Sequence, residues 1–104
     1  MSTRAVQESP IVQGEDEIIT YDLTTTPWGS SPTNVTVKVY DITDGAETDV
    51  TTTIIPTGEA SVSGDVITLP PLRAMTPGKK YRLEVKFTAG GNTLEAYCII
   101  EAEP

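Results

Sequence analysis

The sequence contains no histidine and only one cysteine, Cys98, among its 104 residues. Without histidine the chain cannot build the serine–histidine or cysteine–histidine pairs of nucleophilic catalysis, nor a metal site with histidine ligands. A single cysteine cannot form an internal disulfide or a thiolate zinc cluster. Because Cys98 falls at an apolar position of an expected strand, we interpret it as a small core residue rather than a reactive thiol.

Carboxylates are the remaining candidates for chemistry, and their spacing does not match a calcium-binding loop. They form two groups, Glu15–Glu17 and the set Asp41, Asp44 and Asp49, which we interpret as solvated turn residues. A glycosidase pair needs a substrate cleft, for which a small domain with one tryptophan has little room. No glycine-rich loop precedes a lysine and a helix, as phosphate binding requires. The sequence predicts no enzyme, no metal, no cofactor and no small-molecule substrate.

Basic residues are also scarce, since seven face fifteen acidic ones and the formal net charge is −8. This balance argues against binding to nucleic acid or an anionic membrane. The charge is uneven: residues 1–72 carry two basic and eleven acidic residues, whereas residues 73–104 carry five basic and four acidic ones. The five are Arg73, Lys79, Lys80, Arg82 and Lys86. They are either solvated side chains or a patch that meets an acidic neighbour in an assembly.

Long apolar runs are absent as well, including from the N-terminal stretch MSTRAVQESPIV. That stretch resembles neither a signal peptide nor a membrane helix, which predicts a protein made in the cytoplasm. The length fits one domain that can bury a core of its own. We expect a flexible N-terminus over residues 1–8 and a single domain over residues 9–104.

The clearest pattern is a β-hairpin that ends near Ile100. Tyr81, Leu83, Val85 and Phe87 alternate with polar residues, as in a half-buried strand. A second alternating run follows, in which Leu94, Ala96, Cys98 and Ile100 share the apolar face. The sequence Ala89-Gly90-Gly91-Asn92 between the runs supplies residues that favour positive φ angles. These two strands should form the centre of the sheet.

Shorter strands are expected before this hairpin. We place them at residues 9–13, 18–23, 34–42, 49–55, around Val62, and at 66–69. Sustained helical periodicity is absent, so only a helical turn near Leu72–Met75 is expected. Seven or eight short antiparallel strands separated by turns predict an all-β sandwich of the immunoglobulin-like or fibronectin III-like class.

A tyrosine corner is predicted before the hairpin. Leu72, Met75, Pro77 and Gly78 precede Tyr81 with the spacing of that motif, in which the tyrosine hydroxyl bonds to backbone just upstream. The motif resembles that of fibronectin III and other immunoglobulin-like domains. It predicts the sandwich and gives no information about function.

Three other aromatic residues are candidates for binding. Trp28 lies in the proline-rich loop of residues 24–33, where it either caps the core or stands out as a contact residue. Tyr40 and Tyr97 both fall on the polar side of their strands, and so should point outward.

The layout from residue 16 to residue 101 resembles small immunoglobulin-like structural proteins of phages and prophages, of the fiber-tail adaptor type. The most specific part is the stretch that begins with Thr76–Tyr81 and runs through Asn92–Ala96. The resemblance implies a role in virion assembly, in which copies dock on a larger component and form part of a ring or joint. Its partners would be other virion proteins or further copies of itself, and the protein would be found in the bacterial cytoplasm and then in the virion.

Within that role, Trp28, residues 1–8 and the basic residues Arg73, Lys79 and Lys80 are the candidate contacts. The competing hypothesis is an adhesion or carbohydrate-binding module of a bacterial surface protein. Such a module would show a row of exposed aromatic residues on one sheet face, and Tyr40 and Tyr97 are the residues that would form it.

Overall fold

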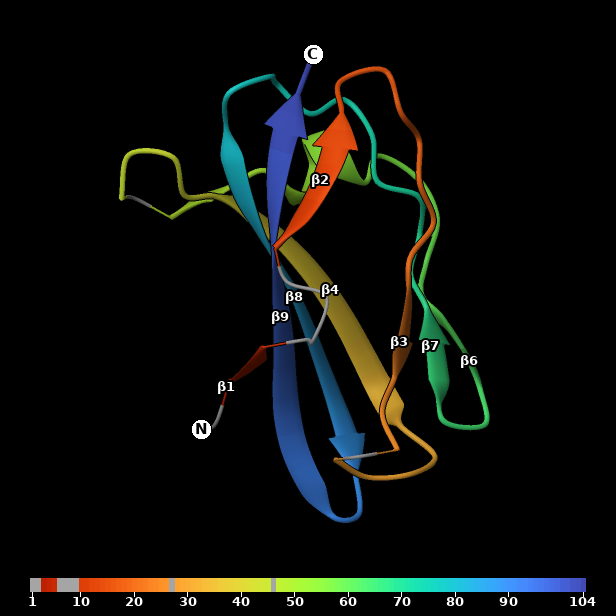
Figure 1. Ribbon diagram of the computed structural model, residues 1–104. Coiled ribbons are helices and arrows are strands. Elements are labelled where there is room, and N and C mark those ends of the chain that lie inside the picture. Colours follow the sequence, from red (N-terminus) through yellow and green to blue (C-terminus); the bar gives the residue numbers. More distant parts are fainter. Residues whose placement is uncertain (1–2, 6–9, 27, 46) are drawn as a thin grey trace.

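The structure is a computed structural model that describes residues 3–5, 10–26, 28–45 and 47–104. Nearly all of its regular structure is β-strand (Figure 1). The strands are β1 Thr3–Ala5, β2 Ile11–Gly14, β3 Asp22–Thr24, β4 Thr33–Asp41, β5 Thr48–Asp49, β6 Ser61–Ser63, β7 Val66–Thr68, β8 Lys80–Ala89 and β9 Asn92–Glu103. A single helical turn, α1 Thr51–Ile54, follows β5 in the described part of the chain.

These strands form a small all-β sandwich of two sheets. The large sheet has the order β1-β9-β8-β4-β5, with β2 also paired to β9, and the small sheet has the order β3-β7-β6. Buried apolar side chains from both sheets make one core between them, including Leu23 and Ile67 from the small sheet and Val39, Phe87 and Ile100 from the large sheet. Figure 1 shows the small sheet on the right and the long β8–β9 hairpin of the large sheet to its left, with the lower part of β4 between them in this view.

The predicted hairpin is confirmed. Strands β8 and β9 pair in antiparallel register from Lys80↔Glu101 to Ala89↔Asn92, and Gly90 and Gly91 make the turn with φ angles of 58° and 80°. Every second side chain of β8 from Tyr81 to Ala89 is buried, as is every second one of β9 from Leu94 to Ala102. The period-2 pattern therefore assigns the inner face of both strands correctly.

The predicted tyrosine corner is also present. The ring of Tyr81 is 3% exposed, and its hydroxyl oxygen accepts a hydrogen bond from the backbone N–H of Thr76 at 2.9 Å. This bond satisfies a backbone donor that the crossover into β8 would otherwise leave unpaired. Tyr81 thus ties the loop to the strand that follows it.

Not all strands are antiparallel, which corrects the expectation for the N-terminal part of the chain. β1 and β2 both run parallel to β9. Side-chain alternation identifies a strand but not its direction, and β2 is followed by a turn at Gly14–Glu17 rather than by a hairpin. Residues 3–5 are paired where a flexible terminus was expected, and residues 1–2 and 6–9 lie outside the described residues.

A buried glutamine holds β2 against the sandwich. Gln13 is fully buried, and its Nε2 donates to the carbonyl oxygens of Leu72 at 2.9 Å and Glu17 at 3.1 Å. Its Oε1 accepts a hydrogen bond from the Tyr21 hydroxyl at 2.8 Å. Burial raises the pKa of Tyr21, helped by Cys98 and Glu17. Three hydrogen bonds offset the cost of removing the amide from water.

The expected strand at residues 49–55 is wrong beyond Asp49, because α1 occupies residues 51–54. The Asp49 carboxylate accepts hydrogen bonds from the N–H and the hydroxyl of Thr51 at 2.9 and 2.6 Å. The Thr51 hydroxyl in turn accepts from the Val39 N–H at 3.0 Å. These local side-chain bonds replace the ladder bonds of a longer β5, and Ile54 becomes buried in the core.

Two further expectations need correction. The helical turn expected at Leu72–Met75 is absent, since Leu72 forms an isolated antiparallel bridge with Ile19 and Ala74 has a φ of 59°. The strand expected at 18–23 is reduced to that bridge and β3. No helix in the described segments is long and apolar enough to cross a membrane.

Candidate binding face

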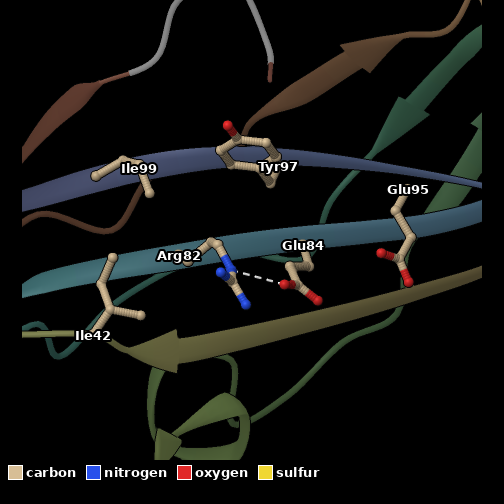
Figure 2. A pocket seen from close by; sticks show the side chains of 6 residues that line it. All are labelled: Ile42, Arg82, Glu84, Glu95, Tyr97 and Ile99. Atoms are coloured by element: carbon tan, nitrogen blue, oxygen red, sulfur yellow. Dashed lines mark ion pairs between the residues drawn. The ribbon is translucent and has the colours of Figure 1, made fainter. Parts of the chain in front are cut away.

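The side of the large sheet that faces away from the small sheet carries a shallow groove. It has a volume of about 440 Å³. Six residues line this groove: Ile42, Arg82, Glu84, Glu95, Tyr97 and Ile99. Figure 2 shows their side chains on neighbouring strands β8 and β9 and just beyond β4. We call this side of the sheet the outer face.

Strand register explains why these residues meet. Arg82 on β8 lies opposite Ile99 on β9, and Glu84 lies opposite Tyr97. Residues directly opposite in an antiparallel pair place their side chains on the same face of the sheet. Ile42 reaches the same place because its N–H donates to the Lys80 carbonyl at 3.0 Å, which continues the β4–β8 pairing past Asp41.

Arg82 is the most constrained charge on the outer face. Its Nη2 donates a 2.5 Å hydrogen bond to Glu47 Oε1, and its Nε lies 2.7 Å from Glu84 Oε2. The second contact is a close ion pair in which the Nε–H does not point well enough at the carboxylate to make a hydrogen bond. Burial opposes the charged form of Arg82, but the two carboxylates outweigh it and raise its pKa.

The two outward tyrosines do not make a continuous row. Tyr40 and Tyr97 are both half-buried on the outer face, as the strand pattern predicted. The Arg82 guanidinium carbon lies 5.8 Å from the centre of the Tyr40 ring, in a cation–π contact. Tyr97 lines the groove, whereas the groove does not include Tyr40. Only Tyr97 therefore offers its ring to a ligand of the groove.

Trp28 lies on the opposite side of the large sheet, against the core. Its ring stacks on that of Phe87, with centroids 6.3 Å apart and an interplanar angle of 28°. It is half-buried and packs against the core cluster. This is the capping role, the first of the two alternatives for Trp28.

The predicted basic contacts Arg73, Lys79 and Lys80 do not line the groove. Arg73 is half-buried, and its backbone N–H donates to the Ile54 carbonyl oxygen. Lys79 pairs with Asp41 at 2.8 Å, and Lys80 is exposed. Of the five basic residues between 73 and 104, Arg82 alone lines the groove.

Asp41 carries a lowered pKa, which predicts a pH effect on stability. Hydrogen bonds from Lys79, and then from Thr43, lower the pKa of Asp41 from 3.8 to about 2. A lowered pKa in the folded state adds stability above pH 3.8 that is lost as the pH falls through 2. Asp41→Asn should lower the free energy of unfolding by only about 1 kcal/mol at pH 7, because water screens the Lys79 side of the ion pair.

Urea unfolding of the wild type and Asp41→Asn between pH 7 and pH 2 measures this effect. The difference in unfolding free energy between the two proteins should shrink below pH 4 and be nearly gone at pH 2. A difference that stays constant over the whole range contradicts the assignment. Asp16→Asn, in an exposed turn, is the matched control and should unfold like the wild type.

Sequence reasoning identified Tyr97 as outward-facing but missed the groove around it. Arg82, Glu84 and Glu95 were expected on the polar side of their strands, and nothing distinguished them from other solvated charges. The sequence pattern places Ile42 at the end of the strand expected at residues 34–42. The missing signal is the register of three strands, which brings Ile42, Ile99 and Tyr97 to the same groove.

Within residues 10–26, 28–45 and 47–104, no group of three or more histidine, cysteine, aspartate or glutamate side chains is arranged to hold a metal ion. No protein-family model matches the chain, and no curated protein matches it.

Proposed function

We propose that the protein is a non-catalytic binding domain that works in virion assembly, and that it contacts its partner through the outer face of the large sheet. The observation that carries this proposal is the groove. It combines the aromatic ring of Tyr97, the aliphatic side chains of Ile42 and Ile99, and a fixed arginine. Aromatic and arginine side chains are enriched in protein–protein interfaces and among the residues that dominate binding energy.

The geometry of the outer face supports a docking role. The β8–β9 ladder runs without a break from Lys80 to Ala89, and the β4–β8 ladder is regular from Thr36 to Asp41. A partner would therefore meet a rigid surface and lose little free energy to ordering it. Arg82 is held in place by Glu47 and Glu84 before any partner arrives. The virion setting rests on the resemblance of residues 16–101 to phage adaptor proteins.

Mass spectrometry of purified particles tests this proposal. Particles induced from a bacterium that carries the gene, and banded on a density gradient, should contain the chain in a fixed ratio to the major structural proteins. Particles of full infectivity that lack the chain, made while it accumulates in the cell, would reject the virion role.

Carbohydrate binding is the second candidate, and the position of Tyr97 favours it. A sugar ring could stack on Tyr97 while Glu84 or Glu95 accepts hydrogen bonds from its hydroxyls. The cation–π contact of Arg82 with Tyr40 speaks against it, because one of the two expected aromatic platforms is engaged with another side chain. Binding to an array of bacterial glycans that Tyr97→Ala abolishes would favour this alternative over the assembly role.

A further inference from the structure

We infer that the groove on the outer face selects a basic segment of a partner protein, in which a lysine or arginine flanked by aliphatic residues pairs with Glu95. This inference rests on the proposed function and names the chemistry of the partner. It follows from the balance of charges inside the groove.

The charge balance of the groove is set by one cation and two carboxylates. Arg82 is engaged by Glu84 within the groove and by Glu47 outside it. Glu84 has its ion pair in Arg82. In the described part of the chain, Glu95 makes no ion pair within 4.0 Å and no hydrogen bond through its carboxylate, so it is the carboxylate of the groove that has no charged partner.

The pairing of β8 with β9 gives Glu95 a basic neighbour with which it could have formed an ion pair. Lys86 lies directly opposite Glu95 across β8 and β9, where oppositely charged residues commonly pair. These two side chains form no ion pair here, and Lys86 is exposed whereas Glu95 is half-buried. The Glu95 carboxylate therefore borders the groove with its charge available to an incoming cation.

The neighbours of Glu95 specify the rest of the ligand. Tyr97 is the next outward residue along β9, so a lysine or arginine at Glu95 would lay its stem or its cation against the ring. Ile99 and Ile42 continue the groove with apolar surface, which suits an aliphatic side chain next to the basic one. The order along β9 is thus carboxylate, aromatic ring and aliphatic side chain.

The charge of the whole chain works in the same direction. A net charge of −8 attracts basic partners over a distance of about 10 Å at 0.1 M ionic strength. An acidic segment would meet both the general repulsion and the unpaired carboxylate in the groove. Net charge would speed the encounter, and Glu95 would fix where the cation docks.

A peptide titration followed by NMR tests the inference without knowledge of the natural partner. The probes are acetyl-Leu-Arg-Leu-amide and the acidic control acetyl-Leu-Glu-Leu-amide, each added to 15N-labelled protein at low salt. The arginine peptide should shift the amide signals of residues 95–99, with a dissociation constant on the order of 1 mM. The acidic peptide should leave those signals in place.

Charge-neutralising variants locate the contact. Glu95→Gln should raise the dissociation constant of the arginine peptide about three- to tenfold, the range between an exposed pair and a charge-assisted hydrogen bond. Glu101→Gln is the matched control, since Glu101 is also half-buried on β9 but does not line the groove. It should change binding by less than about twofold, because a distant surface charge is screened.

Three results would overturn the inference: equal binding of the two peptides, equal weakening by Glu95→Gln and Glu101→Gln, or unshifted groove signals with 20 mM arginine peptide, roughly twentyfold above the expected dissociation constant. The titration also separates this inference from the proposed function. Failure of the peptide to bind, with the chain present in particles, would reject only the basic partner. Specific peptide binding, with the chain absent from particles, would reject only the virion role.

Discussion

Tyr81→Ala should lower the free energy of unfolding by about 3–5 kcal/mol, the usual cost of truncating a large buried aromatic side chain. The ring is 3% exposed, so its removal leaves a cavity between β8 and the loop before it. The hydroxyl oxygen also accepts the hydrogen bond of the Thr76 N–H at 2.9 Å. Because small domains are stable by only about 5–15 kcal/mol, this substitution would remove a large part of the free energy of unfolding.

Tyr81→Phe separates the hydroxyl from the ring. It keeps the packing and removes one acceptor, which should cost on the order of 1 kcal/mol. Urea denaturation of the three proteins, followed by circular dichroism, measures both differences. Equal midpoints for Tyr81→Ala and the wild type would show that the tyrosine corner does not stabilise this fold.

Phe87→Ala is the second substitution with a large expected cost, again about 3–5 kcal/mol. Phe87 is fully buried near the end of β8, and its ring stacks with the ring of Trp28, which lies in the loop before β4. Its loss should therefore also free Trp28, and the tryptophan emission of the still-folded protein should shift to the red. Thr88→Ala, one residue further on the outer face, is the control and should cost less than about 1 kcal/mol.

An unchanged tryptophan spectrum in folded Phe87→Ala would contradict the capping role of Trp28. A small change in stability together with an unchanged spectrum would show that the two rings do not support one another. Since Trp28 is the only tryptophan in the chain, its emission reports on this contact without interference.

The centre of the fold could be predicted because its signals are local. Tyr81, Leu83, Val85 and Phe87 alternate with polar residues, and all four are buried. Two glycines mark the turn that follows. The spacing before Tyr81 identifies the corner, since the motif lies within ten residues of chain. Each of these features needs only neighbouring residues to be recognised.

The segment at residues 50–55 shows where local signals fail. All six of its residues are β-branched, Val50 through Ile55, which favours a strand. It forms a helical turn nevertheless, because the Thr51 hydroxyl bonds to Val39 and Ile54 enters the core. Tertiary contacts from β4 outweigh the propensity of the segment, and no pattern within it reveals them.

The direction of β1 and β2 and the groove on the outer face were hidden for a related reason. A parallel pair with β9 joins the two ends of the sequence, and alternation carries no information about such pairing. The groove likewise requires the register of β8 and β9, and the end of β4, to be known together. Outward-facing Tyr97 could be predicted, but the presence of Ile42 and Arg82 in the same groove could not.

We propose that the outer face of the large sheet makes the functional contact, and competition for incorporation into particles tests this proposal most directly. Wild type and Tyr97→Ala, co-expressed with distinguishable tags, should enter particles in very unequal amounts, at least about tenfold in favour of the wild type, as for a hot-spot aromatic residue. Thr93→Ala, on the same strand outside the groove, should compete equally. Equal incorporation of Tyr97→Ala, with unchanged thermal stability, would contradict the account.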